Sequence, residues 1–425
     1  MNMQAQTRLT AAETALIEAY GGLFGQLPGD GAVTSTRDRL MHELKLAGLP
    51  TRRIEAWHYT DLKTLLKSVP ASAGDESAAV AAPLVAGASV QAIVQGKAAL
   101  DGAIDGVAIK AYAAALASGS AAEALSVSDA DDAIGRINGA FVRDGLIVDV
   151  AAGAEVDQPI ELQSVHAGGQ VHGRIAATFG AGAKATVVER HISADGASAA
   201  LVSSVSDIKL EDGAEVTWII VQAQGADDTH LGQINIDLGK DSKLFLFVLN
   251  VGGKLVRQEI HGVTTGEGAD LKLRGVNLLG DATHTDVTLT LGHDLPNTTS
   301  TEVIRNVVFD NARGVFQGQI RVAPDAQKTD ARMACNTLLM SDDGEFSVKP
   351  ELEIFADDVQ CAHGATVADI DHTHLFYLMA RGISEAKARG LLIKAFVAEI
   401  VEELEDEAIV EALEGVIDSW LEQRA

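Results

Sequence analysis

The two residues best suited to chemistry in this chain stand two positions apart, at Cys361 and His363. On an extended strand, residues i and i+2 point to the same side, so a thiol and an imidazole would face one surface together. Both side chains suit iron, zinc or copper. A closed metal site or an iron–sulfur cluster generally needs about four protein ligands. The pair therefore predicts half of a metal site that a second molecule completes. The alternative is a buried structural cysteine beside a hydrogen-bonded histidine.

Other reactive residues have simpler structural explanations. The segment Asp371-His372-Thr373-His374 has a metal-compatible spacing, but a polar loop between a strand and a helix also explains it. Cys335 lies in an apolar run and is expected in the core. The carboxylates of Asp357 and Asp358 could tune the histidine or form caps. Five further histidines are expected in turns or on faces of the fold: His191, His230, His261, His284 and His293.

The chain lacks the motifs of two common hydrolase classes. Around Gly252-Gly253-Lys254-Leu255 the earlier glycine and the following Ser or Thr of a phosphate-binding loop are missing. The Gly-x-Ser-x-Gly pattern of a nucleophile elbow does not occur either. We therefore expect no nucleotide hydrolysis by this chain itself.

The overall charge and the cysteine count limit the partners further. Its 425 residues predict two or three domains, and 33 basic against 60 acidic residues give a net charge of -27. Such a surface repels phosphate backbones and anionic lipid, so neither nucleic acid nor a membrane is expected as a partner. Two cysteines are too few for a disulfide-rich scaffold or a four-thiolate cluster. The N-terminal residues 1–8 lack the apolar run of an export signal, which predicts a cytoplasmic protein.

The pattern of apolar residues divides the chain into four parts. Residues 1–70 are predicted to be a helical segment, and residues 71–144 a small-residue linker with helices near 108–126 and 129–142. Residues 145–372 are rich in Val, Ile, Leu and Thr with turns between the runs, which predicts strands. Residues 373–425 return to a helical period.

An internal repeat within the strand-rich part indicates its architecture. Small residues recur at turns, with positions 154, 183, 214, 242 and 269 separated by 29, 31, 28 and 27 residues. Each interval holds two strand-like runs. A near-constant period of this length is typical of a solenoid, whose coils bury their apolar faces by stacking. The alternative is an antiparallel sandwich, in which turns recur at shorter intervals of about 8–12 residues.

The C-terminal part predicts two amphipathic helices whose apolar stripes must be buried, mostly against each other. After Ser384, a good N-cap residue, comes a broad apolar stripe, followed by an acidic segment and a second amphipathic helix. An exposed remainder of the stripe would dock a partner protein. The apolar stripe consists of Leu391, Leu392, Ala395, Phe396, Ile400 and Val401.

Several motifs together resemble the SufB/SufD family of iron–sulfur cluster scaffold components. The resemblance spans most of the chain, and its C-terminal third is the most specific part. Within the family, His363-Gly364-Ala365-Thr366 is similar to the SufD members, whereas SufB members typically have Glu after that histidine. The matching segments are Arg53-x-Glu55-x-Trp57-x-Tyr59-Thr60, Gly314 to Gly318, Ala326 to Asp330, Asn336 with Leu338-Leu339, Pro350 to Ile354, Asp357 to Thr366, Leu375 to Leu378, and Arg381-Gly382-Ile383.

The resemblance implies a right-handed parallel β-helix core flanked by N-terminal and C-terminal helical domains. It also implies a complex with a SufB-like subunit and a SufC-like ATPase, which builds clusters in the cytoplasm and passes them to apo-proteins. His363 and Cys361 would then lie at the interface with SufB and hold a transient cluster, with no cofactor stably bound by this chain alone. The implied SufC-docking region, residues 384–404, includes Ala388, Leu391, Leu392, Ala395 and Phe396.

The expected role is that of a non-catalytic scaffold. Two alternatives of other classes stay open. One is a solenoid enzyme that acts on polysaccharide through paired carboxylates, although aromatic residues, which sugar sites commonly use, make up only 4% of the chain. The other is a purely structural homodimer, which this chain could also form in isolation.

Overall fold

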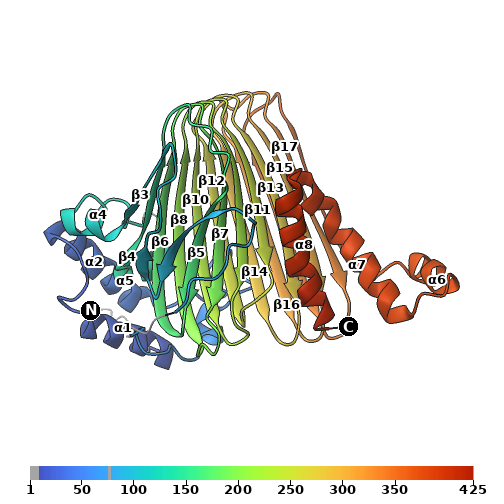
Figure 1. The fold of residues 1–425 in the computed structure, drawn as a ribbon, viewed down its shortest axis with the longest axis horizontal. Helices are drawn as coiled ribbons and strands as arrows, with labels where there is room; N and C mark the ends of the chain where they lie inside the picture. Colours follow the sequence, from blue (N-terminus) through green and yellow to red (C-terminus); the bar gives the residue numbers. More distant parts are fainter. Residues whose placement is uncertain (1–8, 75–77, 128, 130, 425) are drawn as a thin grey trace, which may run out of the picture.

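The computed structural model describes residues 9–74, 78–127, 129 and 131–424 (Figure 1). Residues 1–8, on which the expectation about export rests, lie outside the described residues, as do residues 75–77 of the predicted linker. In the described part no helix has the length and apolar character needed to cross a membrane. Helices from the two ends of the chain flank a strand-rich body.

Two large sheets form this body, and from β4 onward successive strands alternate between them. The ten-stranded sheet contains β1 (Ser89–Val94), β2 (Lys97–Ala99), β5 (Ile160–His166), β7 (Lys184–Ser193), β9 (Glu215–Ala223), β11 (Lys243–Asn250), β13 (Asp270–Leu279), β15 (Thr299–Val308), β17 (Asp330–Leu339) and β19 (Gln360–Ala368). The nine-stranded sheet contains β3 (Val107–Ala111), β4 (Asp144–Val150), β6 (Gly169–Phe179), β8 (Ala200–Leu210), β10 (Thr229–Leu238), β12 (Leu255–Thr264), β14 (His284–His293), β16 (Arg313–Val322) and β18 (Glu345–Ile354).

The predicted solenoid is confirmed, and the antiparallel sandwich is wrong. From β4 to β19 each strand pairs in parallel with the strand two positions further along the chain, as β10 does with β12 and β17 with β19. One strand from each sheet makes a coil, and about eight coils stack along the axis. The apolar side chains of both inner faces form one continuous core between the sheets.

The turn repeat has a backbone cause. Ala183, Ala214, Ser242 and Ala269 are all 0% exposed. The carbonyl of each accepts a hydrogen bond from the coil that follows, as Ala183 does from the N–H of Glu215 at 2.8 Å. The residue before each small residue has a positive φ, which glycine adopts without strain. The same turn recurs beyond the predicted repeat, before Thr298 and Thr329, where non-glycine residues take that conformation: Asn297 at φ 59° and Lys328 at φ 68°.

Between the sheets runs a ladder of asparagine side chains. The Asn250 amide donates to Asn277 at 2.7 Å, and Asn277 donates to Asn306 at 2.7 Å. Asn306 in turn donates to the Thr337 hydroxyl at 3.1 Å. Such bonds satisfy buried amides and hold successive coils in register, because a slipped strand would leave the amides unpaired.

Three of the histidines predicted for turns or faces are in fact buried between the sheets. His191 is 2% exposed, and His230 and His293 are 0% exposed. Their hydrogen bonds to neighbouring polar groups, such as that of His293 Nδ1 with the Thr298 hydroxyl at 2.8 Å, explain how the core accepts them. His261 and His284 do lie on the outer face of the nine-stranded sheet.

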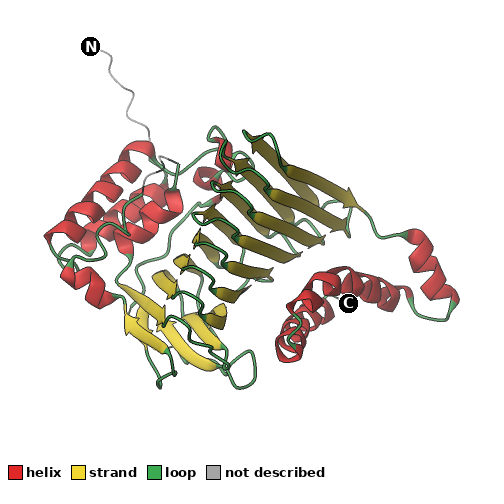
Figure 2. Ribbon diagram, turned by 90° about the horizontal axis from the view of Figure 1, so that it is seen from above, coloured by secondary structure: helices red, strands yellow, loops and turns green. Residues whose placement is uncertain are grey.

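The N-terminal helices cover that outer face (Figure 2). They pack on apolar residues such as Leu201 and Leu231. Trp57 is 0% exposed, with the guanidinium of Arg257 4.4 Å from its ring centroid. The Thr60 hydroxyl lies 2.8 Å from His284 Nε2. The helices are α1 (Ala11–Gly22), α2 (Gly31–Ala47), η1 (Glu55–Trp57), α3 (Leu62–Leu65), α4 (Ala113–Ser118) and α5 (Ala133–Phe141).

The structure corrects the helix predicted near 108–126. Its first residues belong to strand β3, which pairs antiparallel with β4, and α4 takes up only Ala113–Ser118. The predicted linker region also contributes β1, which extends the ten-stranded sheet by pairing in parallel with β5. Tertiary pairing therefore outweighs the helix propensity of an alanine-rich segment.

The C-terminal helices lie on the other side of the molecule, against the outer face of the ten-stranded sheet (Figures 1 and 2). Two ion pairs fasten them there. Arg274 of β13 meets Glu403 at 2.6 Å, and Arg305 of β15 meets Glu399 at 2.7 Å. The helices on the sheet are α7 (Glu385–Val401), η2 (Glu402–Leu404) and α8 (Glu407–Glu422), and α6 (His372–Ala380) precedes them and contacts α7.

The two ends of the solenoid differ. At the N-terminal end, β2 and β3 pair antiparallel with their neighbours and close the stack. At the C-terminal end, the outermost strands are β18 and β19, and no described strand continues either sheet beyond them. The last coil therefore presents unpaired backbone groups and its inner side chains to the surroundings.

One carboxyl group in the core near this end is unsatisfied. Glu302 is 0% exposed, and its two oxygens have no hydrogen-bond partner of ordinary geometry among the described residues. Leu273 and Met333 are its neighbours in the ladder. Burial raises the pKa of Glu302 to about 8, and the Ser300 hydroxyl and the Arg274 charge offset only part of that rise. The folded protein therefore holds a proton here near neutral pH.

This proton makes stability depend on pH. The unfolded chain releases it near the ordinary glutamate pKa of 4.5, so the free energy of unfolding should fall as pH rises from about 5 to 8. Because Glu302→Gln stays neutral, its stability relative to the unmodified protein should rise by on the order of 3 kcal/mol between about pH 5.5 and 8.5, measured by urea denaturation. The exposed Glu353→Gln is the matched control. An identical pH dependence in Glu302→Gln and the unmodified protein would show that Glu302 is ionised in the fold.

Candidate functional site

The open end of the solenoid brings the two predicted ligands together. Strand β19 runs beside β17, with Cys361 opposite Ala331 and His363 opposite Met333. Ala331 and Met333 are 0% and 3% exposed and belong to the core between the sheets. Cys361 and His363 therefore share the inward-facing side of the last coil, where the next coil of a longer solenoid would cover them.

Their surroundings differ in solvent access. Cys361 is half-buried and packs against the core, whereas His363 is exposed. Burial raises the pKa of the Cys361 thiol, and the charges of Asp330 and Glu302 add to the rise against a backbone hydrogen bond at Ala331. The resting thiol is therefore protonated at neutral pH, and a metal ion must displace the proton in order to bind sulfur.

An apolar surface surrounds the pair. Phe346, Val348 and Leu352 of β18 pack against the core but remain partly exposed because no coil lies beyond them. Ile354 and Val367 are each 41% exposed at the same end of the solenoid. Exposed apolar patches commonly mark interaction sites.

The two edge strands differ in how well they resist pairing with another chain. Strand β18 carries Pro350, which has no N–H, and the charged residues Glu351 and Glu353. Prolines and charges are common protection for an exposed sheet edge. Strand β19 contains neither a proline nor a charged residue along Gln360–Ala368. The strand that bears Cys361 and His363 is thus the less protected edge.

The other predicted candidates have structural roles. Asp358 pairs with Lys328, and its backbone N–H donates to Gln327 Oε1 at 2.9 Å. Asp371 caps α6 by accepting from the N–H of Thr373 at 2.7 Å. His372 and His374 are exposed and lie 3.6 and 3.7 Å from the carboxylates of Asp369 and Asp371.

Within the part of the chain that the structure describes, neither the remaining cysteine nor a larger cluster provides a metal site. Cys335 is 1% exposed in the core, and burial raises the pKa of its thiol to about 12. Within the described ranges, no group of three or more His, Cys, Asp or Glu side chains is arranged to hold a metal ion. Cys361 and His363 thus offer two protein ligands.

The predicted docking residues of α7 are divided between its two faces. Leu391 is 43% exposed and Ala395 is also exposed, so both are open to a partner. Leu392 and Phe396 are half-buried, and Phe396 lies 4.8 Å from the guanidinium of Arg305. Ala388 is 0% exposed and packs inside the helical cluster, so it cannot contact a partner directly in this conformation.

Sequence reasoning did not assign docking to α6, which carries a larger exposed apolar surface. Phe376 is 73% exposed, Tyr377 57% and Met379 41%. Helix α6 projects away from the solenoid (Figure 2). The available signal was the run Leu375 to Met379, in which apolar residues occupy consecutive positions and so cannot all face one side of a helix.

Comparisons with known proteins agree on one family. The SufBD core domain, described as SUF system FeS cluster assembly, matches residues 162–396. The iron–sulfur cluster assembly protein SufD of Escherichia coli K12 is 29% identical over 391 residues, covering 87% of this chain and 88% of that protein. An iron–sulfur cluster assembly SufBD family protein of Synechocystis is 32% identical over 200 residues, or 47% of this chain and 44% of the relative. SufD of Plasmodium falciparum is 28% identical over 225 residues, or 53% of this chain and 15% of that longer protein.

The matched core domain contains the stacked coils, the edge strand β19 and the start of the C-terminal helices. The match to the Escherichia coli protein extends over most of the chain. This chain therefore belongs to the SufBD family of iron–sulfur cluster assembly proteins, with SufD proteins among its relatives.

Proposed function

We propose that this chain is a non-catalytic scaffold subunit that pairs with a SufB-like subunit and binds a SufC-like ATPase. A nascent iron–sulfur cluster is the cargo, held transiently between the two scaffold subunits and then passed to apo-proteins or carriers in the cytoplasm. The observation that carries the proposal is the uncovered last coil, whose less protected edge strand bears Cys361 and His363.

The pairing follows from the unsatisfied edge. A strand of the partner can add to β19 through main-chain hydrogen bonds, while its side chains cover the exposed apolar surface of β18. The partner then supplies the ligands that complete a shell of about four around iron. Ligation needs the thiolate of Cys361 and the neutral imidazole of His363, so acidification should weaken cargo binding.

The docking of an ATPase follows from the exposed helices. Phe376 and Tyr377 of α6 and Leu391 of α7 are exposed apolar side chains that a protein partner can bury. Helix α7 and the following turn are tied to β13 and β15 by the ion pairs of Glu403 and Glu399. A nucleotide-driven movement of the ATPase would reach the solenoid through these contacts, and stacked coils would transmit it to the open end as one body.

Replacing His363 tests its role as a ligand. His363→Ala should reduce the cluster yield of the reconstituted complex at least about tenfold, because one of about four ligands is lost. The yield is measured from the visible absorbance and the iron and sulfide content after anaerobic reconstitution. His42→Ala, an exposed histidine on α2, is the control. A yield equal to that of the unmodified complex would remove His363 from the mechanism.

A matched pair of lysines tests the edge strand. Ala365→Lys places a charge on the inward-facing side of β19, where it would block strand pairing, whereas Thr366→Lys places the same charge on the outer side. We expect Ala365→Lys to weaken association with the SufB-like subunit at least about tenfold and Thr366→Lys to change it little. Mass measurement of the purified mixtures is the readout. Equal behaviour of the two variants would place the interface elsewhere.

Charged substitutions test ATPase docking. Phe376→Asp and Leu391→Asp should each abolish co-purification of the SufC-like ATPase, because a buried carboxylate would replace an apolar contact. Phe24→Asp alters another exposed aromatic residue, 77% exposed near the N-terminal helices, and should have no effect. Retained co-purification of both folded variants would contradict docking at this surface.

The same samples separate the two alternatives. A structural homodimer would keep the mass of a dimer in the presence of a SufB-like subunit. An enzyme acting on polysaccharide would release reducing sugar ends without any partner. Either result would overturn the scaffold proposal.

A further inference from the structure

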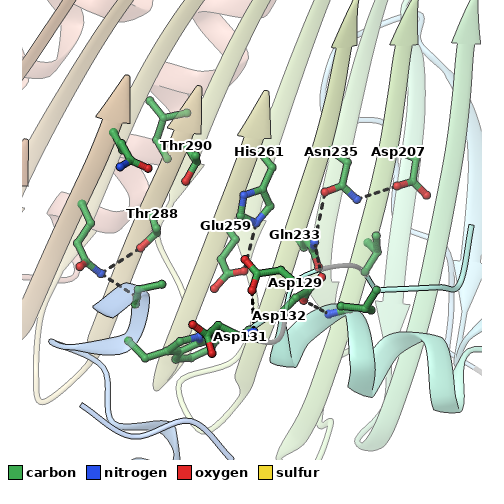
Figure 3. Close-up of a pocket in the computed structure, with 18 of the residues that line it drawn as sticks. Asp129, Asp131, Asp132, Asp207, Gln233, Asn235, Glu259, His261, Thr288 and Thr290 are labelled. Atoms are coloured by element: carbon green, nitrogen blue, oxygen red, sulfur yellow. Dashed lines mark hydrogen bonds and ion pairs between the residues drawn. The ribbon is translucent and has the colours of Figure 1, made fainter. Parts of the chain in front are cut away.

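A cavity of about 670 Å³ lies between the N-terminal helices and the outer face of the nine-stranded sheet (Figure 3). Its volume is within the range of about 300–1,000 Å³ that is common for small-molecule sites. The cavity is separate from the inward-facing pair Cys361 and His363, because it opens on the opposite face of the coils. Any ligand here would add a function to the scaffold role.

The floor of the cavity consists of two rows of polar side chains. Strand register aligns Gln233, Glu259, Thr288 and Gln317 in one row, one residue on each successive strand. The second row, two residues further along the same strands, is Asn235, His261, Thr290 and Gln319. Polar residues are ordinary on a solvated sheet face, but here Gln233, Glu259, Thr288 and Gln317 are only 4–7% exposed. Buried polar side chains around an unfilled space are what a binding site for a polar ligand requires.

The N-cap of α5 and the turn at η1 form the roof. Asp132 caps α5 by accepting from the N–H of Gly135 at 2.6 Å, and its other oxygen accepts from the Gln233 amide at 3.1 Å. The indole N–H of Trp57 donates to the carbonyl of Asp131 at 3.2 Å. The Gln317 amide donates to the carbonyl of Ala56 at 3.0 Å. These bonds fix the roof to the floor.

The amide donors of Gln233 and Asn235 in the floor are already used. The Gln233 amide group donates to Asp132 and to Asn235 Oδ1, and the Asn235 amide donates to Asp207 at 2.8 Å. Arg174 binds Asp207 at 2.8 Å. Gln233 Oε1 is a buried acceptor that has no hydrogen-bond partner among the described residues. Turning the amide over would place this oxygen against the Asp132 carboxylate, so its orientation is fixed.

The charges around the cavity also favour a cationic ligand. Its fixed cations among the described lining residues are Arg174 and Lys349, and both are paired with carboxylates. Burial, followed by the charge of Glu259, raises the pKa of Asp132. No ion pair joins Asp131 to any residue that the structure describes. The cavity thus has an excess of negative charge and an unpaired acceptor, which a cation bearing N–H donors would relieve.

We propose that this cavity binds a small organic cation with several N–H donors, of the linear polyamine class. Gln233 Oε1 and the carboxylates of Asp131 and Asp132 accept from its ammonium groups, and the polar rows of the floor lie along its length. The roof makes the site a pocket, which suits a small molecule better than a protein segment.

Isothermal titration calorimetry of the full chain with spermidine, at an ionic strength of about 0.15 M, tests the proposal. We expect saturable binding at one site per chain. A neutral diol of similar length should not bind. Thr290→Trp fills the cavity from its floor and should weaken binding at least about tenfold. Asp131→Asn removes one carboxylate and should weaken it about threefold.

The matched control is Asp343→Asn, which removes an exposed carboxylate from a turn of the solenoid. It should leave the affinity unchanged, and it separates site binding from general attraction to an acidic protein. If Thr290→Trp fails to fold by thermal unfolding, the comparison of Asp131→Asn with Asp343→Asn decides. Absence of saturation, or equal binding in all folded variants, would overturn the proposal.

Discussion

A coil of this solenoid is complete only when another coil lies against it. Each inner strand has backbone hydrogen bonds on both edges, and the apolar rows between the sheets are buried because coils repeat above and below. Antiparallel strands end the stack at one side, but at the other side β18 and β19 have no further neighbour among the described strands. Cys361 and His363 lie on that last coil, so this constraint determines their surroundings. The pair is accessible because stacking stops there, and a protein that continued the stack would bring its own side chains to it.

The sequence predicted the solenoid because the stacking requirement recurs at one backbone position. Where that position is glycine, as at Gly182 and Gly213, the repeat can be recognised from the amino-acid sequence alone. It becomes invisible further on, where Asn297 and Lys328 adopt the same positive φ with different side chains. The sequence analysis did not predict strand β3, because the local sequence there indicates a different element. Its alanine-rich surroundings have helix propensity, and only the pairing with β4, which no local pattern encodes, turns the segment into a strand.

The candidate site shows the same division between local and tertiary information. Spacing alone indicated that Cys361 and His363 would share one side of a strand, and β19 has that geometry. Their exposure depends on where the stack ends, which spacing does not reveal. The helical stripe of α7 was read correctly as apolar, but the sheet beneath it decides which members are buried. Ala388 is therefore inaccessible and Leu391 is open. Glu302 carried no signal at all, since its environment is made by strands about 30 residues away on either side.

Charged side chains connect the C-terminal helices with the buried Glu302 and with Cys361. Arg274 lies on the outer side of the ten-stranded sheet, where it holds Glu403 of the C-terminal helices at 2.6 Å. Its charge also lowers the pKa of Glu302, against the larger effect of burial, and Glu302 would raise the pKa of Cys361 only when it is ionised, above its own pKa of about 8. A change in how the helices sit on the sheet would therefore alter the field at a buried, proton-holding carboxyl group as well as the position of the coils. In the proposed scaffold, ligation of iron would require the Cys361 proton to leave, so movement of the helices and the change in electrostatic field would both act at the open end.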